Sequence, residues 1–571
     1  NISCIISLYR NIWSCLKMIV GIDLGTTNSL VGIYQDGQVK LIPNAFGEFL
    51  TPSVVALDDN DEIIVGKIAK ERLVTHPDKT VSQFKRFMGT KHELKLGSRT
   101  YKAEELSSFI IRKLIDDVET YLGKEVDEVI VSVPAYFNDA QRYATKLAGQ
   151  FAGVKIDRII NEPSAAALAK RSMLNQEDQS LIVVDFGGGT LDISVVELFD
   201  NIVEIVSIAG DNRLGGEDFT SVIAEEFLVA NQLNKEAISR EFYGKVLVQA
   251  EKVKLELNSK EEVQMVVLDE EKEFSLVLTY QRFYELCKPL LVRVKSVLDR
   301  ALLDANNSYV TSNHFVLVGG TSKLRLVQDF LSYCTKQIVE VSVDPDLIIA
   351  RGCALLAGIK ERQGEIRDLL LSDICPFTLG IGIVGDHFSP IIERNSSLPA
   401  SRIEYYSTSY LGQSQVKIRI YQGEMMKASQ NLFLGELDVP VPINHQINES
   451  FTVRFTYDLN GILDVEVKID STQEVFSRAI LQDSITLTEQ EIKIKQAELS
   501  RYKINAQETE IYQFLVEKSN RLYAMLLGKR RTELMTATIQ FEEQVNQASM
   551  YHLPKIYQSF SRYLDQVERG L

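Results

Sequence analysis

The sequence of 571 residues is poor in residues that bind metals or form disulfides. Its six cysteines lie far apart and include no C-x-x-C pair, which argues against a zinc site and a disulfide framework and favours a reducing compartment. Its six histidines are equally scattered, so a histidine-based metal site is not expected. Tryptophan occurs once, as Trp13.

Long apolar runs and an excess of basic residues are also missing. No uninterrupted run of about 18 apolar residues occurs, which argues against a membrane span and favours a soluble protein. Lys and Arg number 62 against 78 Asp and Glu, and the net charge of −16 opposes binding to nucleic acid or to an anionic membrane.

Neither of two common nucleotide-binding motifs is supported by the sequence. No G-x-x-x-x-G-K-[ST] loop is present, which excludes a P-loop site. The string GIGIVG (380–385) matches the dinucleotide fingerprint, but strand-like residues and a proline follow where a helix should begin. We therefore interpret this match as chance.

The composition is otherwise that of a globular chain, with 45% hydrophobic and 25% charged residues, and its length predicts several domains. Residues 1–17 carry short apolar runs broken by Arg10 and Lys17 and lack a small-x-small cleavage site. We expect this segment to be a non-native extension before Met18, with a degenerate export signal as the alternative.

Two hairpins with glycine turns suggest a duplicated half-fold. Residues 19–24 (IVGIDL) are a β-rich run ending in Asp23 and a glycine turn, and LVGIY (30–34) resumes the strand. The same shape returns at 182–196 (IVVDFGGGTLDISVV), where Asp185 takes the place of Asp23.

Strands and helices alternate between and after these hairpins, as in DEVIVSVP (127–134), DAQRYATKLAGQFAG (139–153) and KIDRIINEPSAAALAK (155–170). The alternation predicts an α/β fold with a mixed sheet in each half. A third strand with a glycine turn, FVLVGG (315–320), leads into a helix predicted from Leu324. Such a turn leaves backbone amides free for an anion or a ribose.

The pattern changes after this α/β part, which we place at 18–367. DLLLSD (368–373) is a candidate linker, and the β-rich segment 374–484, with alternating strands and a DLNG turn, predicts a small β-sandwich. Residues 485–571 contain a capping box at ThrGluGlnGlu (488–491) and helical periodicity. An independent coiled coil is the alternative for this helical end, although its heptads are short.

The paired hairpins carry the candidate chemistry. Asp23 and Asp185 stand at strand ends beside turns of Gly and Thr, and would face each other across a cleft if the halves are pseudo-symmetric. Backbone amides and threonine hydroxyls can hold phosphate oxygens, while carboxylates hold the water shell of Mg²⁺. The pattern therefore predicts nucleotide hydrolysis, with two plain β-turns as the alternative.

Three segments resemble the nucleotide signatures of the DnaK-type seventy-kilodalton heat-shock chaperones: IVGIDLGTTNS (19–29), IVVDFGGGTLDIS (182–194) and FVLVGGTSK (315–323). VSVPAYFNDAQR, RIINEPSAAAL and AGDNRLGGEDF extend the resemblance, which runs from Met18 to the C-terminus. FSPIIERNSSLP (388–399) and the short helical end resemble the HscC-type bacterial branch. The resemblance implies an α/β actin-like ATPase domain of two pseudo-symmetric lobes, a β-sandwich peptide-binding domain and an α-helical lid.

The resemblance also implies roles at the nucleotide site. Asp23 and Asp185 would hold hydrated Mg²⁺, and Lys85 would neutralise the γ-phosphate, although a lysine beside an arginine is ordinarily a solvated charge. Glu162 and Asp192 would orient the attacking water or its magnesium. Whether K⁺ also binds is left open. Other positions implied to contact ATP or ADP are Gly25, Thr26, Thr27, Asn28, Gly187, Gly188, Gly189, Thr190, Gly215, Gly216, Glu217, Glu251, Lys254, Asn258, Gly319, Gly320, Lys323 and Asp346.

Further positions are implied for peptide binding and for communication between the domains. Pro134 and Arg142 match a switch proline and a relay arginine, and Arg158 and Asp373 match positions that engage a J-domain co-chaperone. An apolar slot at the edge of a sandwich suits an extended peptide, with plain sandwich core as the alternative for each residue. The matching positions are Ile381, Val384, Tyr406, Ser409, Val416 and Ile418.

Several positions depart from the family pattern. Lys323 replaces the adenine-stacking arginine, Asn258 a serine near the ribose, and Ser372 the last linker leucine. Val384 and Ser409 stand where a Met–Ala arch is usual. The short segment from Ser259 to Leu278 leaves open whether a nucleotide exchange factor is needed.

We therefore expect an ATPase that works as a chaperone, binding and releasing extended hydrophobic segments of unfolded proteins in the bacterial cytoplasm, with a J-domain partner. A sugar kinase of the same fold and a filament-forming ATPase of the actin kind are the rival classes. The residues after Asp373 argue against both rivals, because neither class needs a linker, a sandwich and a lid.

Overall fold

The computed structural model describes residues 18–173, 179–199, 201–269, 272–306, 314–337, 339, 341, 344–362, 366, 369–480, 489–499, 507–547 and 553–570. The expected extension, residues 1–17, and Thr488 of the capping box lie outside the described residues.

A six-stranded mixed sheet organises the first lobe. The first predicted hairpin is confirmed, because β1 and β2 are antiparallel with Gly21 opposite Gly32. Helices α3 (Ala103–Leu122) and α4 (Asp139–Phe151) share one hydrophobic core with this sheet. The strands in spatial order are β11 (Lys155–Asn161), β10 (Glu128–Val133), β1 (Ile19–Asp23), β2 (Asn28–Gln35) and β3 (Gln38–Leu41), with β4 (Thr51–Pro52) beside β2.

A five-stranded sheet organises the second lobe. The second predicted hairpin is confirmed, because β12 and β13 are antiparallel with Asp185 opposite Asp192. Its strands in spatial order are β17 (His314–Val318), β12 (Gln179–Phe186), β13 (Leu191–Phe199), β14 (Ile202–Asp211) and β18 (Leu370–Ser372). Its outer face shares one hydrophobic core with α6 (Gly216–Ala230), α7 (Arg240–Glu256), α8 (Tyr280–Asp304) and α9 (Arg325–Thr335).

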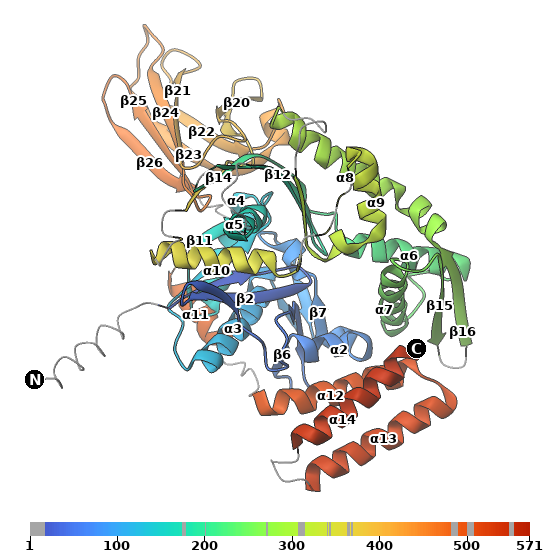
Figure 1. Cartoon of the computed structure of the whole chain (residues 1–571). Helices are drawn as coiled ribbons and strands as arrows, with labels where there is room; N and C mark the ends of the chain where they lie inside the picture. Colours follow the sequence, from blue (N-terminus) through green and yellow to red (C-terminus); the bar gives the residue numbers. More distant parts are fainter. Residues whose placement is uncertain are drawn as a thin grey trace, which may run out of the picture.

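Two helices lie between the sheets of the two lobes (Figure 1). Helix α5 (Glu162–Met173) and helix α10 (Ile348–Lys360) form one core with strands of both sheets. The helix predicted after Leu324 is confirmed, since α9 begins at Arg325. The layered α/β arrangement with a mixed sheet in each half is also confirmed.

Smaller elements extend each lobe. The first lobe adds β5 (Val54–Leu57), β6 (Ile63–Val65), α2 (Lys67–Thr75), η1 (Pro77–Lys79), β7 (Thr80–Ser82), η2 (Phe84–Phe87), β8 (Leu94–Leu96) and β9 (Arg99–Tyr101). The second adds the antiparallel pair β15 (Glu262–Asp269) and β16 (Lys272–Thr279), and η3 (Gly320–Lys323).

Two four-stranded antiparallel sheets follow, here called the two-sheet unit (residues 374–480). Alternating inward residues such as Phe451, Val453 and Phe455 of one sheet meet Ile418 and Ile420 of the other in a single core. The sheets contain β20 (His387–Ile392), β19 (Leu379–Ile383), β22 (Gln415–Gln422) and β23 (Leu432–Pro440), and β21 (Ala400–Ser407), β24 (Ser450–Tyr457), β25 (Leu463–Ile469) and β26 (Val475–Ile480); η5 (Ala428–Gln430) joins β22 to β23.

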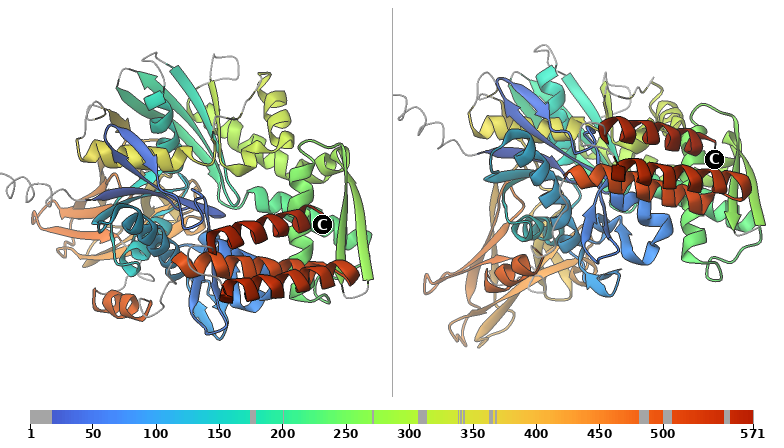
Figure 2. Two further views of the ribbon diagram at one scale, coloured as in Figure 1. Left: turned by 60° about the horizontal axis from the view of Figure 1, so that its bottom comes forward. Right: turned by 90° about the horizontal axis from the view of Figure 1, so that it is seen from below.

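Helices end the chain and lie along the first lobe (Figure 2). They are α11 (Glu489–Leu499), α12 (Gln507–Met525), α13 (Gly528–Gln547) and α14 (Leu553–Arg569). Phe514, Leu515 and Leu522 of α12 share a core with Ile64 and Ile68 of the first lobe, so this end is packed and not a separate handle. Among the described helices, none is both long and apolar enough to cross a membrane.

Candidate nucleotide site

The two hairpins bring their glycine turns together. A Cβ added to Gly188 would collide with the hydroxyl oxygen of Thr27, and one added to Gly189 would lie 2.8 Å from Cγ2 of Thr26. Gly25 is tied within its own turn, since its N–H donates to Oγ of Ser29 at 3.2 Å. The close approach leaves the turns of both lobes facing each other, as the pseudo-symmetry predicts.

Four carboxylates are buried beside these turns. Asp23, Glu162, Asp185 and Asp192 are each no more than 6% exposed. Burial and the charge of Glu162 raise the pKa of Asp23 to about 7 and that of Asp192 to about 8, and they hold the pKa of Asp185 well above its usual value. The raised pKa values mean that the ionised carboxylates are unfavourable in this cluster, and a bound cation would stabilise them.

The same carboxylates fit hydrated magnesium. Oδ2 of Asp185 and Oδ2 of Asp192 are buried and have no hydrogen-bond partner in the protein. Carboxylate oxygens are ligands that Mg²⁺ prefers, and it often keeps part of its water shell. Within the described residues no three acidic, His or Cys side chains converge to ligate a metal directly, and a water-mediated site does not require them.

Lys85 supplies the positive charge in this cluster. It lies in η2, is 4% exposed, and its Nζ donates to Oε1 of Glu162 at 2.8 Å. The ordinary alternative of a solvated surface lysine is therefore wrong. A fixed ammonium among carboxylates can stabilise the charge that develops during phosphoryl transfer.

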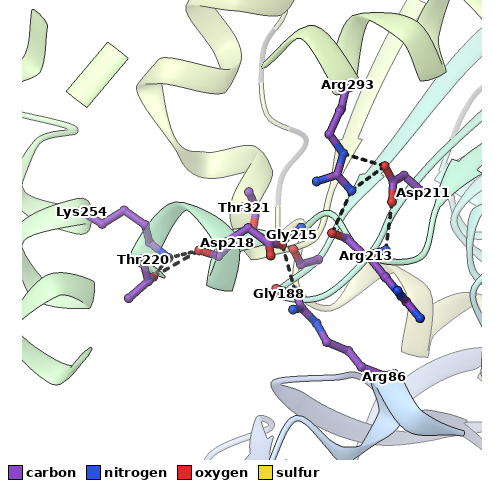
Figure 3. Close-up of polar contacts among 12 residues, drawn as sticks. Arg86, Gly188, Asp211, Arg213, Gly215, Asp218, Thr220, Lys254, Arg293 and Thr321 are labelled. Atoms are coloured by element: carbon purple, nitrogen blue, oxygen red, sulfur yellow. Dashed lines mark hydrogen bonds and ion pairs between the residues drawn. The ribbon is translucent and has the colours of Figure 1, made fainter. Parts of the chain in front are cut away.

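Arg86 is a polar residue that the sequence reasoning missed. Its Nη2 donates to the carbonyl oxygen of Gly188 at 3.2 Å and to Oδ2 of Asp218 at 3.0 Å (Figure 3). Arg86 thus links the first lobe to the second directly beside the glycine turn. The family resemblance implies a role for its neighbour Lys85 but indicates none for Arg86.

The start of α6 completes the second lobe's side of the site. Gly215 precedes this helix, and Nζ of Lys254 donates to the carbonyl oxygen of Gly216 at 3.0 Å and to Oγ1 of Thr220 at 2.9 Å (Figure 3). Nζ of Lys254 also pairs with Glu251 at 2.6 Å. Burial raises the pKa of Glu217, with the charge of Glu251 adding to this effect.

Three further predicted nucleotide residues, Gly319, Gly320 and Lys323, lie at the turn after β17. Gly319 has φ of 79°, and η3 carries Gly320 and Lys323. Lys323 is ion-paired with Asp346 and its side chain is 46% exposed. Asn258 turns its amide oxygen to the N–H of Arg325 at 2.9 Å, a contact that the sequence did not indicate.

The predicted communication residues meet around Asp373. The side-chain amide of Asn161 donates to both carboxylate oxygens of Asp373 at 2.9 Å, and Oγ of Ser164 donates at 3.0 Å. Nη2 of Arg142 donates to Oδ1 of Asn161 at 2.6 Å. Arg142 and Asp373 are therefore joined through one amide. Pro134 is buried at the end of β10, and Arg158 is half-buried on β11.

Strand β18 lies within the predicted linker. It pairs in parallel with β14, with Leu371 opposite Val203. The DLNG turn, noted only as a hairpin signal, lies against the first lobe, because the N–H of Ile159 donates to Oδ1 of Asn460 at 3.2 Å. The two-sheet unit is thus docked on the first lobe.

The predicted peptide-binding residues fall into two groups. Ile381 and Ile418 are each 2% exposed within the core of the two-sheet unit. Tyr406 and Val416 are half-buried, and the Tyr406 hydroxyl lies 3.0 Å from Oγ of Ser389. Val384, which is 74% exposed, and Ser409 lie at the surface.

Two lobes with mixed sheets, facing glycine hairpins and buried acids define an ATPase of the actin-like class. The family model described as "Hsp70 protein" matches residues 19–567. The chain is 37% identical over 504 residues to the "Chaperone protein DnaK" of Thermotoga neapolitana, covering 85% of this chain and 84% of the relative. The DnaK proteins of Thermotoga petrophila and Thermotoga maritima match with the same identity and coverage.

The chain belongs to the Hsp70 family. It is accordingly an ATP-dependent chaperone that binds unfolded polypeptides, and an ATPase that uses ATP and ADP with Mg²⁺.

Proposed function

We propose that Lys85 and its four carboxylate neighbours are the ATP-hydrolysing centre. Asp23 and Asp185 hold the water shell of magnesium, while Glu162 and Asp192 orient the attacking water. The single observation that carries the proposal is the buried contact of 2.8 Å between Lys85 and Glu162. Bound magnesium would supply charge neutralisation on the phosphate oxygens, and Lys85 adds a fixed positive charge there.

The nucleotide contacts follow the same arrangement. We assign the phosphates to the two turns, through Gly25, Thr26, Thr27 and Asn28 and through Gly187, Gly188, Gly189 and Thr190. The nucleoside is assigned to residues at the start of α6, in and after α7, around η3 and before α10. They are Gly215, Gly216, Glu217, Glu251, Lys254, Asn258, Gly319, Gly320, Lys323 and Asp346. K⁺ beside the phosphates is part of the proposal.

The domain boundaries are proposed as follows. Residues 18–367 form the ATPase domain, 368–373 the linker, 374–484 the peptide-binding β-sandwich and 485–571 the helical lid. The two-sheet unit supports the sandwich, because its sheets share one core. A client segment would lie beside Tyr406 and Val416, between Val384 and Ser409. The core residues Ile381 and Ile418 would lie behind this surface.

Hydrolysis is coupled to peptide capture through the docked linker. Pro134 lies directly after β10, and Arg142 contacts Asn161, which holds Asp373. A change at the nucleotide can therefore reach the linker through packed and hydrogen-bonded groups. Release of Asp373 would free β18 and the two-sheet unit to close on a peptide.

Partners and location complete the proposal. A J-domain co-chaperone engages the surface around Arg158 and Asp373, and the protein works in the bacterial cytoplasm. Within the family it resembles the HscC-type branch. An exchange factor is not assigned. The net charge of −16 supports the absence of nucleic-acid and membrane partners.

The experiment is single-turnover ATP hydrolysis with and without an unfolded hydrophobic peptide. Stimulation by peptide supports the chaperone, whereas phosphate transfer to a sugar would support the kinase. ATP-dependent sedimentation would support a filament-forming ATPase. The packed two-sheet unit and helices after Asp373 favour the chaperone over both.

A further inference from the structure

We infer that Ser132 is a positioning residue that fixes the carboxylate of Asp23 for magnesium-bound nucleotide, an inference that rests on the proposed role of Asp23. The two residues face each other in parallel register on β10 and β1. Oγ of Ser132 donates to Oδ1 of Asp23 at 2.7 Å. Ser132 is fully buried and Asp23 is 6% exposed, so water does not compete for this hydrogen bond.

The direction of the Ser132 hydroxyl is itself constrained. A serine hydroxyl has one proton to donate and two lone pairs to accept with. Gly21 of β1 packs directly on the Cys353 backbone, which holds α10 against this strand. Because the Ser132 hydroxyl donates its one proton to Asp23, that proton points toward the carboxylate.

The neighbouring carboxylates are fixed differently. Asp192 accepts the N–H of Tyr136 at 3.3 Å, while Oδ2 of Asp185 has no partner. At Asp23, Ser132 occupies Oδ1, so Oδ2 is the oxygen that would take a metal-bound water. A carboxylate that holds metal-bound water through one oxygen is oriented by groups behind it, and loss of such groups weakens metal binding.

The test compares Ser132→Ala, Ser132→Thr and a matched control, Ser194→Ala. Ser194 is also a fully buried serine on a hairpin strand, and its Oγ has no hydrogen-bond partner. Binding of a fluorescent ADP analogue is titrated with Mg²⁺ for each variant, with the affinity in EDTA as the baseline. Thermal unfolding checks that each variant is folded.

Ser132→Ala should raise the Mg²⁺ concentration for half-maximal ADP binding by about fivefold, as expected for one lost hydrogen bond. ADP affinity in EDTA should stay unchanged. Ser132→Thr keeps the hydroxyl and should remain within about twofold of the wild type, as should Ser194→Ala.

An Ala variant within twofold of the wild type, or a Thr variant no better than Ala, would overturn the inference. Asp23→Asn tests the proposed role of Asp23 separately from the positioning role of Ser132. If Asp23→Asn raises the Mg²⁺ requirement and Ser132→Ala does not, the positioning role alone fails. If neither changes it, the proposed role of Asp23 fails as well.

Discussion

The ring of Tyr136 packs against the ring of Phe377, with the two centroids 4.3 Å apart. Tyr136 belongs to the first lobe and donates its N–H to the buried carboxylate of Asp192 at 3.3 Å, whereas Phe377 precedes β19 in the two-sheet unit. Tyr136 thus contacts both the buried carboxylate cluster and the docked two-sheet unit. The position of the two-sheet unit is therefore linked to the geometry of Asp192.

Phe377→Ala should weaken this docking. An aromatic pair contributes about 1 kcal/mol beyond its buried area, so the equilibrium constant for docking should fall about fivefold. Fluorescence energy transfer between the first lobe and the two-sheet unit, with ATP bound, measures the change. Phe433→Ala is the control, because Phe433 is 43% exposed and packs on Tyr421 of the same unit. Equal effects of both substitutions would refute a specific role for Phe377.

Lys85→Ala should slow hydrolysis about a hundredfold while ATP still binds. Loss of one fixed charge at the reacting phosphate costs about 3 kcal/mol of transition-state stabilisation, or a rate about a hundredfold lower. Single-turnover hydrolysis measures the rate, and nucleotide binding is measured separately. Lys79→Ala, which breaks a surface pair with Asp61, serves as the control. A Lys85→Ala rate within threefold of the wild type would exclude Lys85 as the catalytic lysine.

The contact between Asp139 and the two-sheet unit predicts a pH dependence of docking. Oδ1 of Asp139 accepts the Tyr457 hydroxyl at 2.7 Å and the Gln422 amide at 3.5 Å, while its Oδ2 and Oε1 of Gln422 are buried without partners. Burial raises the pKa of Asp139 from 3.8 to about 6, against the effects of the Tyr457 hydrogen bond and of Arg142; Asp458 adds to the rise. Docking of the two-sheet unit therefore favours the protonated form of Asp139, so a proton binds to this carboxyl group on docking.

The sign follows from this raised pKa. The proton-linked contribution to docking is full below about pH 4, falls as the pH rises through about 4 to 6, and is lost above about pH 6. The docking constant should thus be about fourfold higher at pH 5.5 than at pH 7.5. Energy transfer between the two parts measures it, and Asp139→Asn should remove this difference. A difference that persists in the Asn variant would assign it to other groups.

Lys323→Arg should tighten ADP. A lysine ammonium does not stack as a guanidinium does, and the ammonium of Lys323 is engaged by Asp346. A cation–π contact at a partly exposed site is worth about 1 kcal/mol, so the release of a fluorescent ADP analogue should slow about fivefold. Lys336→Arg, a lysine at the end of α9, is the control. An unchanged or faster release from Lys323→Arg would show that the lysine does not make exchange easy.

The features that the sequence predicted are mostly local. A strand, an acid and a glycine turn are short-range patterns, which is why the hairpins around Asp23 and Asp185 and the helix after Leu324 are confirmed.

Other features depend on contacts between distant segments. Nothing near Lys85 in sequence indicates burial, which arises because Glu162 lies beside it after folding. Tyr457 and Asp139 are separated by 318 positions, and each is locally an ordinary strand or helix residue. Sequence periodicity also does not distinguish Ile381, fully in the core, from a residue that lines a binding surface.

The most direct test of the account is ATP-triggered release of a fluorescent hydrophobic peptide from the purified chain, followed by stopped flow. Wild-type protein should bind the peptide with ADP and release it at least tenfold faster on addition of ATP. Asp373→Ala, which removes the carboxylate held by Asn161 and Ser164, should still bind peptide but lose the acceleration. Val416→Phe should weaken peptide binding while keeping basal hydrolysis. Absence of peptide binding in both nucleotide states, or a release rate that ATP does not change, would contradict the account.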